Sequence, residues 1–238
     1  MKDSDYQITV AMSDDTVDAL YRKGLTLYGF KAVQTTARAA PLIWFKSATF
    51  MDTLMLSWTE RYQVYTSNSV VIPGRPVAIG SSYPIALGDA LTITRPNGTG
   101  VIASSIGTPD AITIDNEASI EFTCGISQAQ PYGSVMPVCA FPLFSGAAQA
   151  VAPIEQILLL FSTTRLNVGT VMEQSNGAGL MIDLTASNNR TVCFDIDTGW
   201  SWGRGIWARP VPPNSNLVPL LVQSPPALAR RRIVGLRA

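Results

Sequence analysis

Apolar and polar residues alternate along several short segments of this chain. Tyr6, Ile8 and Val10 are separated by polar residues, and the same alternation runs through 120–126 and 192–196. A repeat of two residues is the side-chain period of a β-strand with one buried face. The sequence therefore predicts strands in these segments. Weaker alternation predicts further strands at 25–34, 58–66, 91–94, 111–115 and 180–184.

Turn-forming residues separate the predicted strands at short intervals. Pro73-Gly74 and Pro96-Asn97-Gly98 are two examples, and glycine, proline and asparagine favour tight turns over long helices. Many short strands joined by turns are typical of a sandwich or a barrel. We therefore expect an all-β fold, an antiparallel β-sandwich that is either one wide unit or two similar units in tandem.

One short helix is predicted at 13–23. Ser13 is a favourable N-cap residue, and Asp14 and Asp15 suit the positive end of the helix dipole. Gly24 ends the segment. The helix is expected to join two strands.

Two octets of similar character suggest an internal repeat. The segments 52–59 and 155–162 each begin with an acidic residue and continue into an apolar run. A duplication and a chance likeness between strands both remain open interpretations. We divide the chain into an N-terminal β unit at 1–130, a C-terminal β unit at 131–223 and a basic tail rich in proline and arginine at 224–238.

Composition narrows the classes of partner. The chain is 47% hydrophobic and only 14% charged, and its 17 basic residues balance its 17 acidic ones. A molecule without net charge has no long-range field to attract nucleic acid, so no nucleic-acid partner is expected. No apolar run is long enough for a transmembrane helix and no Sec-type signal peptide is recognisable. We expect a cytoplasmic protein or one exported by a non-classical route.

Catalytic and metal-binding motifs lack the residues that they need. Gly199 to Gly203 fits the GxSxG pattern of serine hydrolases, but the chain contains no histidine to accept the serine proton. Asp197-Thr198-Gly199 has no second copy to form the carboxylate pair of an aspartic protease. Asp195, Asp197 and Asp183 lack a calcium-binding loop, and the cysteines at 124, 139 and 193 lack zinc-site spacing. We expect no enzyme, no metal and no cofactor.

The most informative segment is 199–209. It holds three of the five tryptophans, Trp200, Trp202 and Trp207, together with Arg204 and Arg209. Large rings in a glycine-rich stretch suit stacking on sugars or a place at a membrane interface, and arginines suit anionic groups. A hydrophobic lid over one end of the sandwich explains the same residues equally well. These five residues are the candidate ligand-binding site.

These observations favour a non-enzymatic binding protein. The expected partner is a glycan or a lipid surface, so the protein would be lectin-like, or membrane-active like soluble β-type cytolysins, an analogy of architecture only. The alternative is a self-assembling structural protein that forms a homo-oligomer, a particle or a filament, because the chain has few charges. In either case a homo-oligomer is expected.

The C-terminal tail predicts a salt-dependent association. Residues 224–238 contain Arg230, Arg231, Arg232 and Arg237 and no acidic residue, so they suit an acidic neighbour or an anionic surface. Deleting 224–238 should weaken association and reduce its dependence on ionic strength. Light scattering of the full and shortened chains across a salt series measures this. Unchanged association in the shortened chain would show that the tail does not contribute to association.

Overall fold

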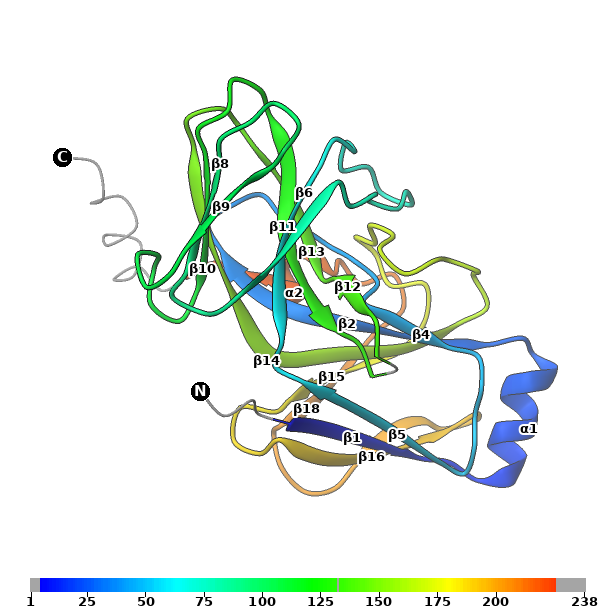
Figure 1. The fold of residues 1–238 in the computed structure, drawn as a ribbon. Coiled ribbons are helices and arrows are strands. Elements are labelled where there is room, and N and C mark those ends of the chain that lie inside the picture. The colour runs from blue at the N-terminus through cyan, green and yellow to red at the C-terminus, as the bar shows by residue number, and fades with distance from the viewer. Residues whose placement is uncertain (1–4, 132, 226–238) are drawn as a thin grey trace.

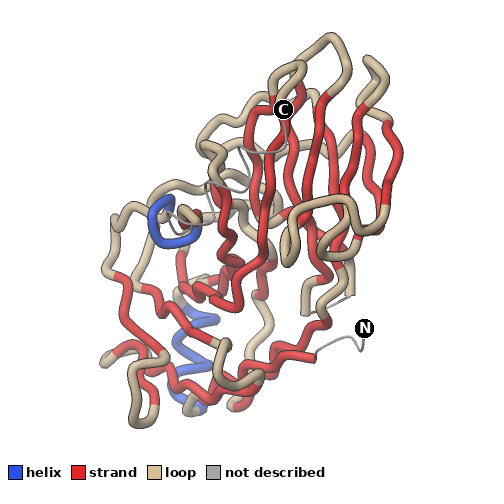
Figure 2. Tube along the Cα trace, turned by 90° about the vertical axis from the view of Figure 1, so that its left-hand side faces the viewer, coloured by secondary structure: helices blue, strands red, loops and turns tan. Residues whose placement is uncertain are grey.

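Strands make up most of the chain in the computed structural model, which describes residues 5–131 and 133–225. The described chain has two helices, and Figure 2 shows that strands and loops form nearly all of the trace. The expected all-β, sandwich-like fold with a short helix near the N-terminus is confirmed. Helix α1 (Asp14–Arg22) begins after Ser13, whose hydroxyl accepts a hydrogen bond from the backbone N–H of Thr16.

The smallest sheet has four strands in the order β17-β16-β1-β5. β1 lies between β5, which runs antiparallel to it, and β16, which runs parallel to it. The parallel pair joins segments far apart in the sequence, as parallel strands require a long connection. The four strands are β1 (Asp5–Ala11), β5 (Thr53–Thr59), β16 (Asn189–Asp195) and β17 (Gly199–Trp202).

The largest sheet has nine strands built around β14 (Ala148–Ser162), the longest strand of the described chain. β14 pairs with three strands, two of them on different stretches of the same edge. The other eight strands are β2 (Thr26–Thr35), β4 (Phe45–Ser47), β8 (Ala90–Ile93), β9 (Gly100–Ala103), β10 (Ile112–Asn116), β15 (Gly179–Asp183), β18 (Ala208–Val211) and β19 (Val222–Gln223).

The third sheet has six strands and contains no parallel pair among those described. Its centre is β11, which pairs with β6, β12 and β13. The strands are β3 (Ala40–Pro41), β6 (Tyr62–Ser67), β7 (Ser81–Ile85), β11 (Phe122–Ala129), β12 (Val135–Pro137) and β13 (Cys139–Leu143).

Each predicted strand lies where the structure has a strand, except that one predicted strand corresponds to two. The predicted strand at 58–66 is two strands, because the chain leaves the four-stranded sheet after β5 and enters the six-stranded sheet with β6. Glu60 and Arg61 make this crossing. A second, very short helix, α2 (Val218–Leu221), was not predicted, since one turn of helix leaves no periodic pattern in a sequence.

Two groups of strands are stacked in Figure 1 and share β14 and β2. The upper group contains the six-stranded sheet with β8, β9 and β10, and the lower group contains the four-stranded sheet with β15 and β18. The predicted boundary at residue 130 falls between β11 and β12, which pair with each other, and β1 pairs with β16 across it. The division into 1–130 and 131–223 remains a prediction.

The middle of the nine-stranded sheet is buried on both faces. Leu159 belongs to the main core, which lies between this sheet and the other two. Leu158 and Leu160 belong to a second cluster, covered by Leu217 and Leu221 from α2 and the residue before it. A strand buried on both sides has no polar alternation, which explains the continuous apolar run from Ile157 to Phe161.

A break in the pairing of β14 with β2 lies where the two strand groups meet. Pro153 pairs with Val33 and Ile157 pairs with Lys31, so three residues of β14 stand opposite Ala32 alone. The middle residue of the three is Glu155. Extra residues in one strand bend it and increase its twist, and here the bend lets one strand serve both groups.

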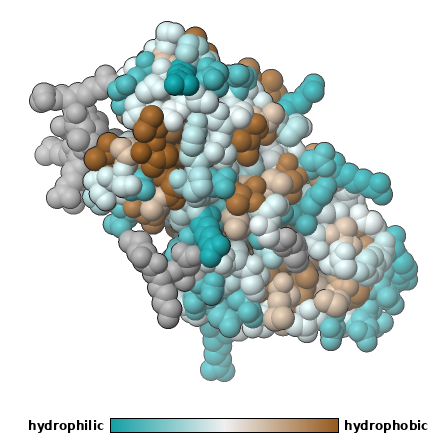
Figure 3. All heavy atoms as spheres, in the orientation of Figure 1, coloured by the Kyte–Doolittle hydropathy of each residue, from teal (hydrophilic) through white to brown (hydrophobic). Residues whose placement is uncertain are grey.

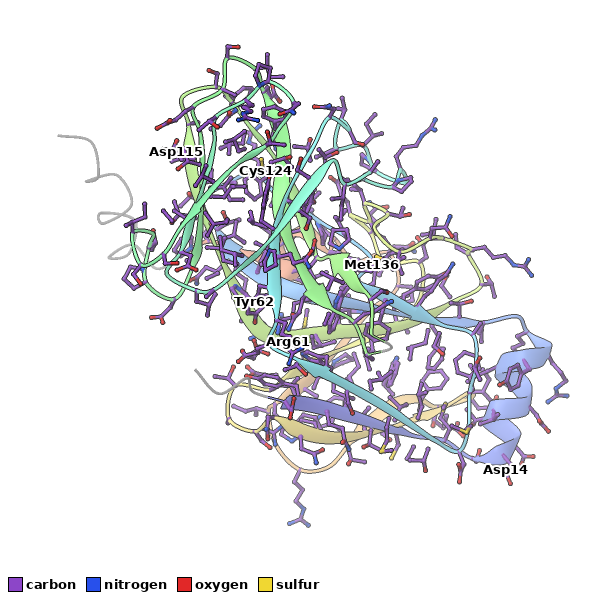
Figure 4. The ribbon with its side chains drawn as sticks, in the orientation of Figure 1. Asp14, Arg61, Tyr62, Asp115, Cys124 and Met136 are labelled. Carbon is purple, nitrogen blue, oxygen red and sulfur yellow. The ribbon has the colours of Figure 1, made fainter. Side chains whose placement is uncertain are left out.

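A buried ion pair between Lys31 and Glu155 lies at this break in the pairing. Lys31 Nζ lies 2.6 Å from Glu155 Oε2, with the Lys31 side chain fully buried and that of Glu155 16% exposed. The Lys31 ammonium also lies 5.6 Å from the centre of the Tyr6 ring. The Tyr6 and Tyr62 hydroxyls donate to Glu60, and Figure 4 shows Tyr62 at the level where the two strand groups meet. β1, β2, β6 and β14 are thus joined through one polar cluster.

Burial dominates the titration of this pair. It raises the pKa of Glu155, the neighbouring Glu60 raises it further, and the Lys31 charge opposes both effects. Burial likewise lowers the pKa of Lys31, against the attraction of Glu155. Removing one member leaves the other charge buried without its partner, which is more costly than removing both.

We expect Glu155→Gln to lower the free energy of unfolding by about 3–5 kcal/mol, the range for one lost partner of a buried pair. The double variant Lys31→Met/Glu155→Gln should recover most of that loss, because it removes both charges. Urea unfolding at neutral pH measures all three proteins. A single variant as stable as the parent would contradict the structural role of the pair.

Candidate functional site

The tryptophan segment begins with a hairpin between β16 and β17. Asp195 Oδ1 accepts hydrogen bonds from the backbone N–H groups of Asp197 and Thr198 and from the Thr198 hydroxyl, and Gly199 has a φ of 80°. These hydrogen bonds, led by that from the Thr198 backbone, lower the pKa of Asp195. The DTG sequence is therefore a turn between two strands, and Ser201 of the GxSxG pattern is an exposed residue of the edge strand β17.

Trp200 and Trp202 point to the same side of β17, as their spacing predicts. Trp200 pairs with Phe194, and its ring stacks on Phe161 at a centroid distance of 5.4 Å. Trp202 pairs with Val192. Both rings are half-buried and pack against the main core. This packing is that of a lid over the core.

The indole N–H groups of this lid are already used. Trp200 Nε1 donates to the carbonyl oxygen of Ala178 at 3.3 Å, and Trp202 Nε1 donates to that of Gly205 at 3.2 Å. A ring that contacts a sugar or a lipid head group commonly offers this donor to it. In both rings the donor is directed to the protein's own backbone.

Trp207 has a different environment. The chain turns through Gly203 to Ile206, and in this turn Arg204 is exposed and Ile206 is fully exposed. The Trp207 ring is half-buried, and the Arg190 guanidinium carbon lies 4.8 Å from its centre. Stacking with a cation fixes the orientation of the ring.

A hollow of about 590 Å³ opens beside Trp207. β14, β15, β18, β19 and α2 all contribute to it, and Ile206, Trp207 and Ser224 line it from outside these elements. It is lined by Gln156, Met181, Asp183, Ile206, Trp207, Ala208, Arg209, Pro219, Val222, Gln223 and Ser224.

A polar chain of side chains runs along this hollow. Gln223 Nε2 donates to Gln156 Oε1 at 2.9 Å, and Gln156 Nε2 donates to Asp183 Oδ2 at 3.2 Å. Asp183 Oδ1 accepts from the backbone N–H of Thr185. Each amide therefore has a fixed orientation, and its remaining donors and acceptors face a defined direction.

Asp183 is held in its ionised form. Partial burial raises its pKa, but hydrogen bonds from Thr185 and Gln156 and the charge of Arg190 outweigh that effect, so the pKa lies below its usual value. An ionised carboxylate accepts hydrogen bonds and donates none. Asp183 is therefore an acceptor at neutral pH.

The structure brings together some of the predicted site residues and separates others. Trp207 and Arg209 line the hollow, whereas Trp200, Trp202 and Arg204 do not. The predicted contacts at Arg230, Arg231, Arg232 and Arg237 lie outside the described residues.

Sequence analysis missed the polar residues of the hollow and of the ion pair. The sequence drew attention to Asp183 only together with Asp195 and Asp197, as possible calcium ligands without a binding loop, and Gln156 and Gln223 carry no motif. Lys31 within an apolar strand and Glu155 at the edge of an apolar run were the available signals, because a charge in such a place needs a partner.

The described part of the chain contains no group of three or more potential metal ligands, and none of its helices is long and apolar enough to cross a membrane. The three cysteines are free. Burial raises the pKa of the Cys124 and Cys139 thiols to about 12, so these two are unreactive core residues.

Figure 3 shows apolar residues in several separate patches on one face, between weakly polar ones. Comparison with protein-family models, curated proteins and solved structures finds no significant match to this chain. Its function is therefore inferred from its own residues.

The lid interpretation predicts the effect of removing a ring. Trp200→Ala should lower the free energy of unfolding by about 3 kcal/mol, the lower end of the range for a buried aromatic residue, because the Trp200 ring contacts Phe161 and Phe194. The neighbouring Ser201→Ala, at an exposed position, should change it by less than about 0.5 kcal/mol. Urea unfolding measures both. Equal stability of parent and Trp200→Ala would favour an exposed contact surface.

Proposed function

We propose that this chain is a non-enzymatic, lectin-like binding protein that takes a glycan in the hollow beside Trp207. The observation that carries the proposal is the presence of an aromatic ring, an ionised carboxylate and a guanidinium on one hollow, in Trp207, Asp183 and Arg209. Sugars present C–H faces to rings and hydroxyl groups to polar side chains. The hollow offers both kinds of contact.

Each polar group has a separate role in this proposal. Asp183 accepts hydrogen bonds from sugar hydroxyls, Arg209 donates to them, and Gln156 and Gln223 do either through their amides. The hydrogen bonds between Gln223, Gln156 and Asp183 fix these groups before the ligand arrives. A site that is already ordered loses less conformational entropy on binding.

Binding without hydrolysis follows from the carboxylates present. Glycoside hydrolysis generally uses two carboxyl groups, one of them protonated to act as an acid. The hollow is lined by Asp183 and by no second carboxylate of the described chain, and the lowered pKa of Asp183 keeps it ionised. It suits recognition better than proton transfer.

One observation favours a membrane surface as a second candidate partner. Ile206 is fully exposed at the turn before Trp207, and the exposed Arg204 lies two residues away. An apolar tip beside a cation suits insertion among anionic lipid head groups. This candidate uses Ile206 and Arg204, whereas the glycan proposal uses Asp183 and Arg209.

A glycan array followed by calorimetry with the best ligand tests the proposal. Arg209→Gln and Asp183→Asn should each weaken binding about tenfold or more, since hydrogen bonds to charged groups contribute about 1.5–3 kcal/mol. Arg204→Gln, the same change of charge at an arginine outside the hollow, should leave affinity unchanged.

Two outcomes would contradict the glycan proposal. One is a glycan array on which the protein binds no ligand. The other is a ligand whose affinity is the same for the parent, Arg209→Gln and Asp183→Asn. Flotation with neutral and anionic vesicles is the parallel experiment for the second candidate. Vesicle binding that is lost in Ile206→Ser and Arg204→Gln would assign the membrane as the partner.

A further inference from the structure

Strand β5 forms an edge of the four-stranded sheet. It pairs with β1 through seven consecutive residues without a bulge, and no other described strand pairs with it. Leu54, Leu56 and Trp58 point into the core, while Met55 and Ser57 are exposed on the opposite face. β5 is therefore a straight and regular strand whose second side is available for pairing.

The backbone of β5 has hydrogen-bonding groups directed away from the sheet. The N–H of Met12 donates to the carbonyl of Asp52 at 2.7 Å, and Met12 and Asp52 continue the register of the strand pair. Antiparallel ladders alternate, so the backbone of Leu54 and Leu56 also faces β1. That of Met55 and Ser57 faces outward, and within the described residues these N–H and C=O groups have no hydrogen-bond partner.

Three other edge strands carry protection that β5 lacks, and the edge strands β9 and β17, which also lack proline and charge, are only four residues long. β7 contains Pro84, β3 contains Pro41, and β18 contains Arg209 and Pro210. Prolines, charged residues and bulges are the usual means of preventing an edge strand from pairing with another chain. The sequence of β5, Thr-Leu-Met-Leu-Ser-Trp-Thr, contains no proline and no charged residue.

We propose that β5 pairs antiparallel with β5 of a second copy of this chain across a two-fold axis. The two four-stranded sheets then form one eight-stranded sheet. The pairing is self-complementary, because each copy offers the same outward N–H and C=O groups to the other. The low charge of the strand removes the repulsion that would otherwise act between identical edges.

The flanking charges select the register. With Met55 opposite Met55 of the second copy, Thr53 lies opposite Ser57, and Asp52 lies away from Glu60. A register centred on Leu56 would place Asp52 opposite Glu60 of the second copy, and like charges directly opposite each other are destabilising. The register centred on Met55 avoids that contact.

This dimer is independent of the proposed glycan site. The hollow is built on β14, β15, β18, β19 and α2, whereas β5 belongs to the four-stranded sheet. A dimer would carry two hollows, and two linked sites bind a repeating ligand more tightly than one. Failure of either proposal leaves the other testable.

The mass of the particle in solution tests the dimer. Light scattering after size exclusion should give twice the 25.6 kDa of the chain. Met55→Pro removes one outward N–H and should give the single-chain mass, because a proline at an edge position leaves the ladder with β1 intact. Met55→Thr keeps the N–H and should remain dimeric. Ile106→Lys, at an exposed isoleucine between β9 and β10 and outside the four-stranded sheet, is the control for surface changes and should also remain dimeric.

Disulfide cross-linking keeps the test decisive if Met55→Pro fails to fold. Residues opposite each other in a hydrogen-bonded antiparallel pair have Cα atoms about 5.5 Å apart, within the roughly 4.4–6.8 Å span of a disulfide. In a Cys193→Ser background, which removes the exposed thiol, Met55→Cys should form a covalent dimer on mild oxidation. Ser201→Cys, on the opposite edge strand β17, should not.

Two results would overturn the proposal. A parent chain that stays at 25.6 kDa at the highest concentration reached shows that β5 does not pair with a second copy. A dimer that persists in folded Met55→Pro, or that Met55→Cys does not cross-link, places the interface elsewhere. Binding of an unrelated strand at β5 by an otherwise monomeric chain would also overturn it.

Discussion

The break in β14 is the feature on which the rest of the structure depends. One strand serves both groups of strands, and it does so by placing three residues opposite Ala32 alone. Such a bend directs Glu155 toward the interior, where its charge requires a partner. Lys31 supplies it at 2.6 Å. A buried pair of this kind contributes little net stability but penalises arrangements that separate its charges, so it fixes how β2 and β14 lie against each other.

The same sheet forms most of the hollow in which we propose that a glycan binds. The middle of β14 is buried on both faces, so polar side chains reach the surface only near its bend and at the ends of its neighbours. Gln156 is the last residue of the break, and Asp183 is its partner in β15. The hollow therefore lies beside the one place where the geometry of β14 changes. Groups held on strands keep their positions more accurately than groups on loops.

Sequence patterns predicted the half-buried strands well because one face of each is polar. Tyr6, Ile8 and Val10 are an example, and Ser13 marked the start of α1 correctly. Sequence patterns could not identify β14 as the strand shared by both groups, because a strand buried on both faces shows no alternation of apolar and polar residues. The spacing of Trp200 and Trp202 gave their common direction, but whether that side is core or solvent depends on Phe161, which is distant in the sequence.

The tryptophan segment shows why residue type alone does not define a binding site. Trp200 and Trp202 have the composition of a contact surface, yet their indole N–H groups are bound to backbone carbonyls and their rings close the core. Trp207 follows the turn through Gly203 to Ile206; it also packs against the main core, but it lines the hollow together with Asp183 and Arg209. Two rings of the segment thus stabilise the hairpin next to the hollow, and one lines the hollow itself. Under the glycan proposal, this division lets a single short segment both close the core and offer a ring to the ligand.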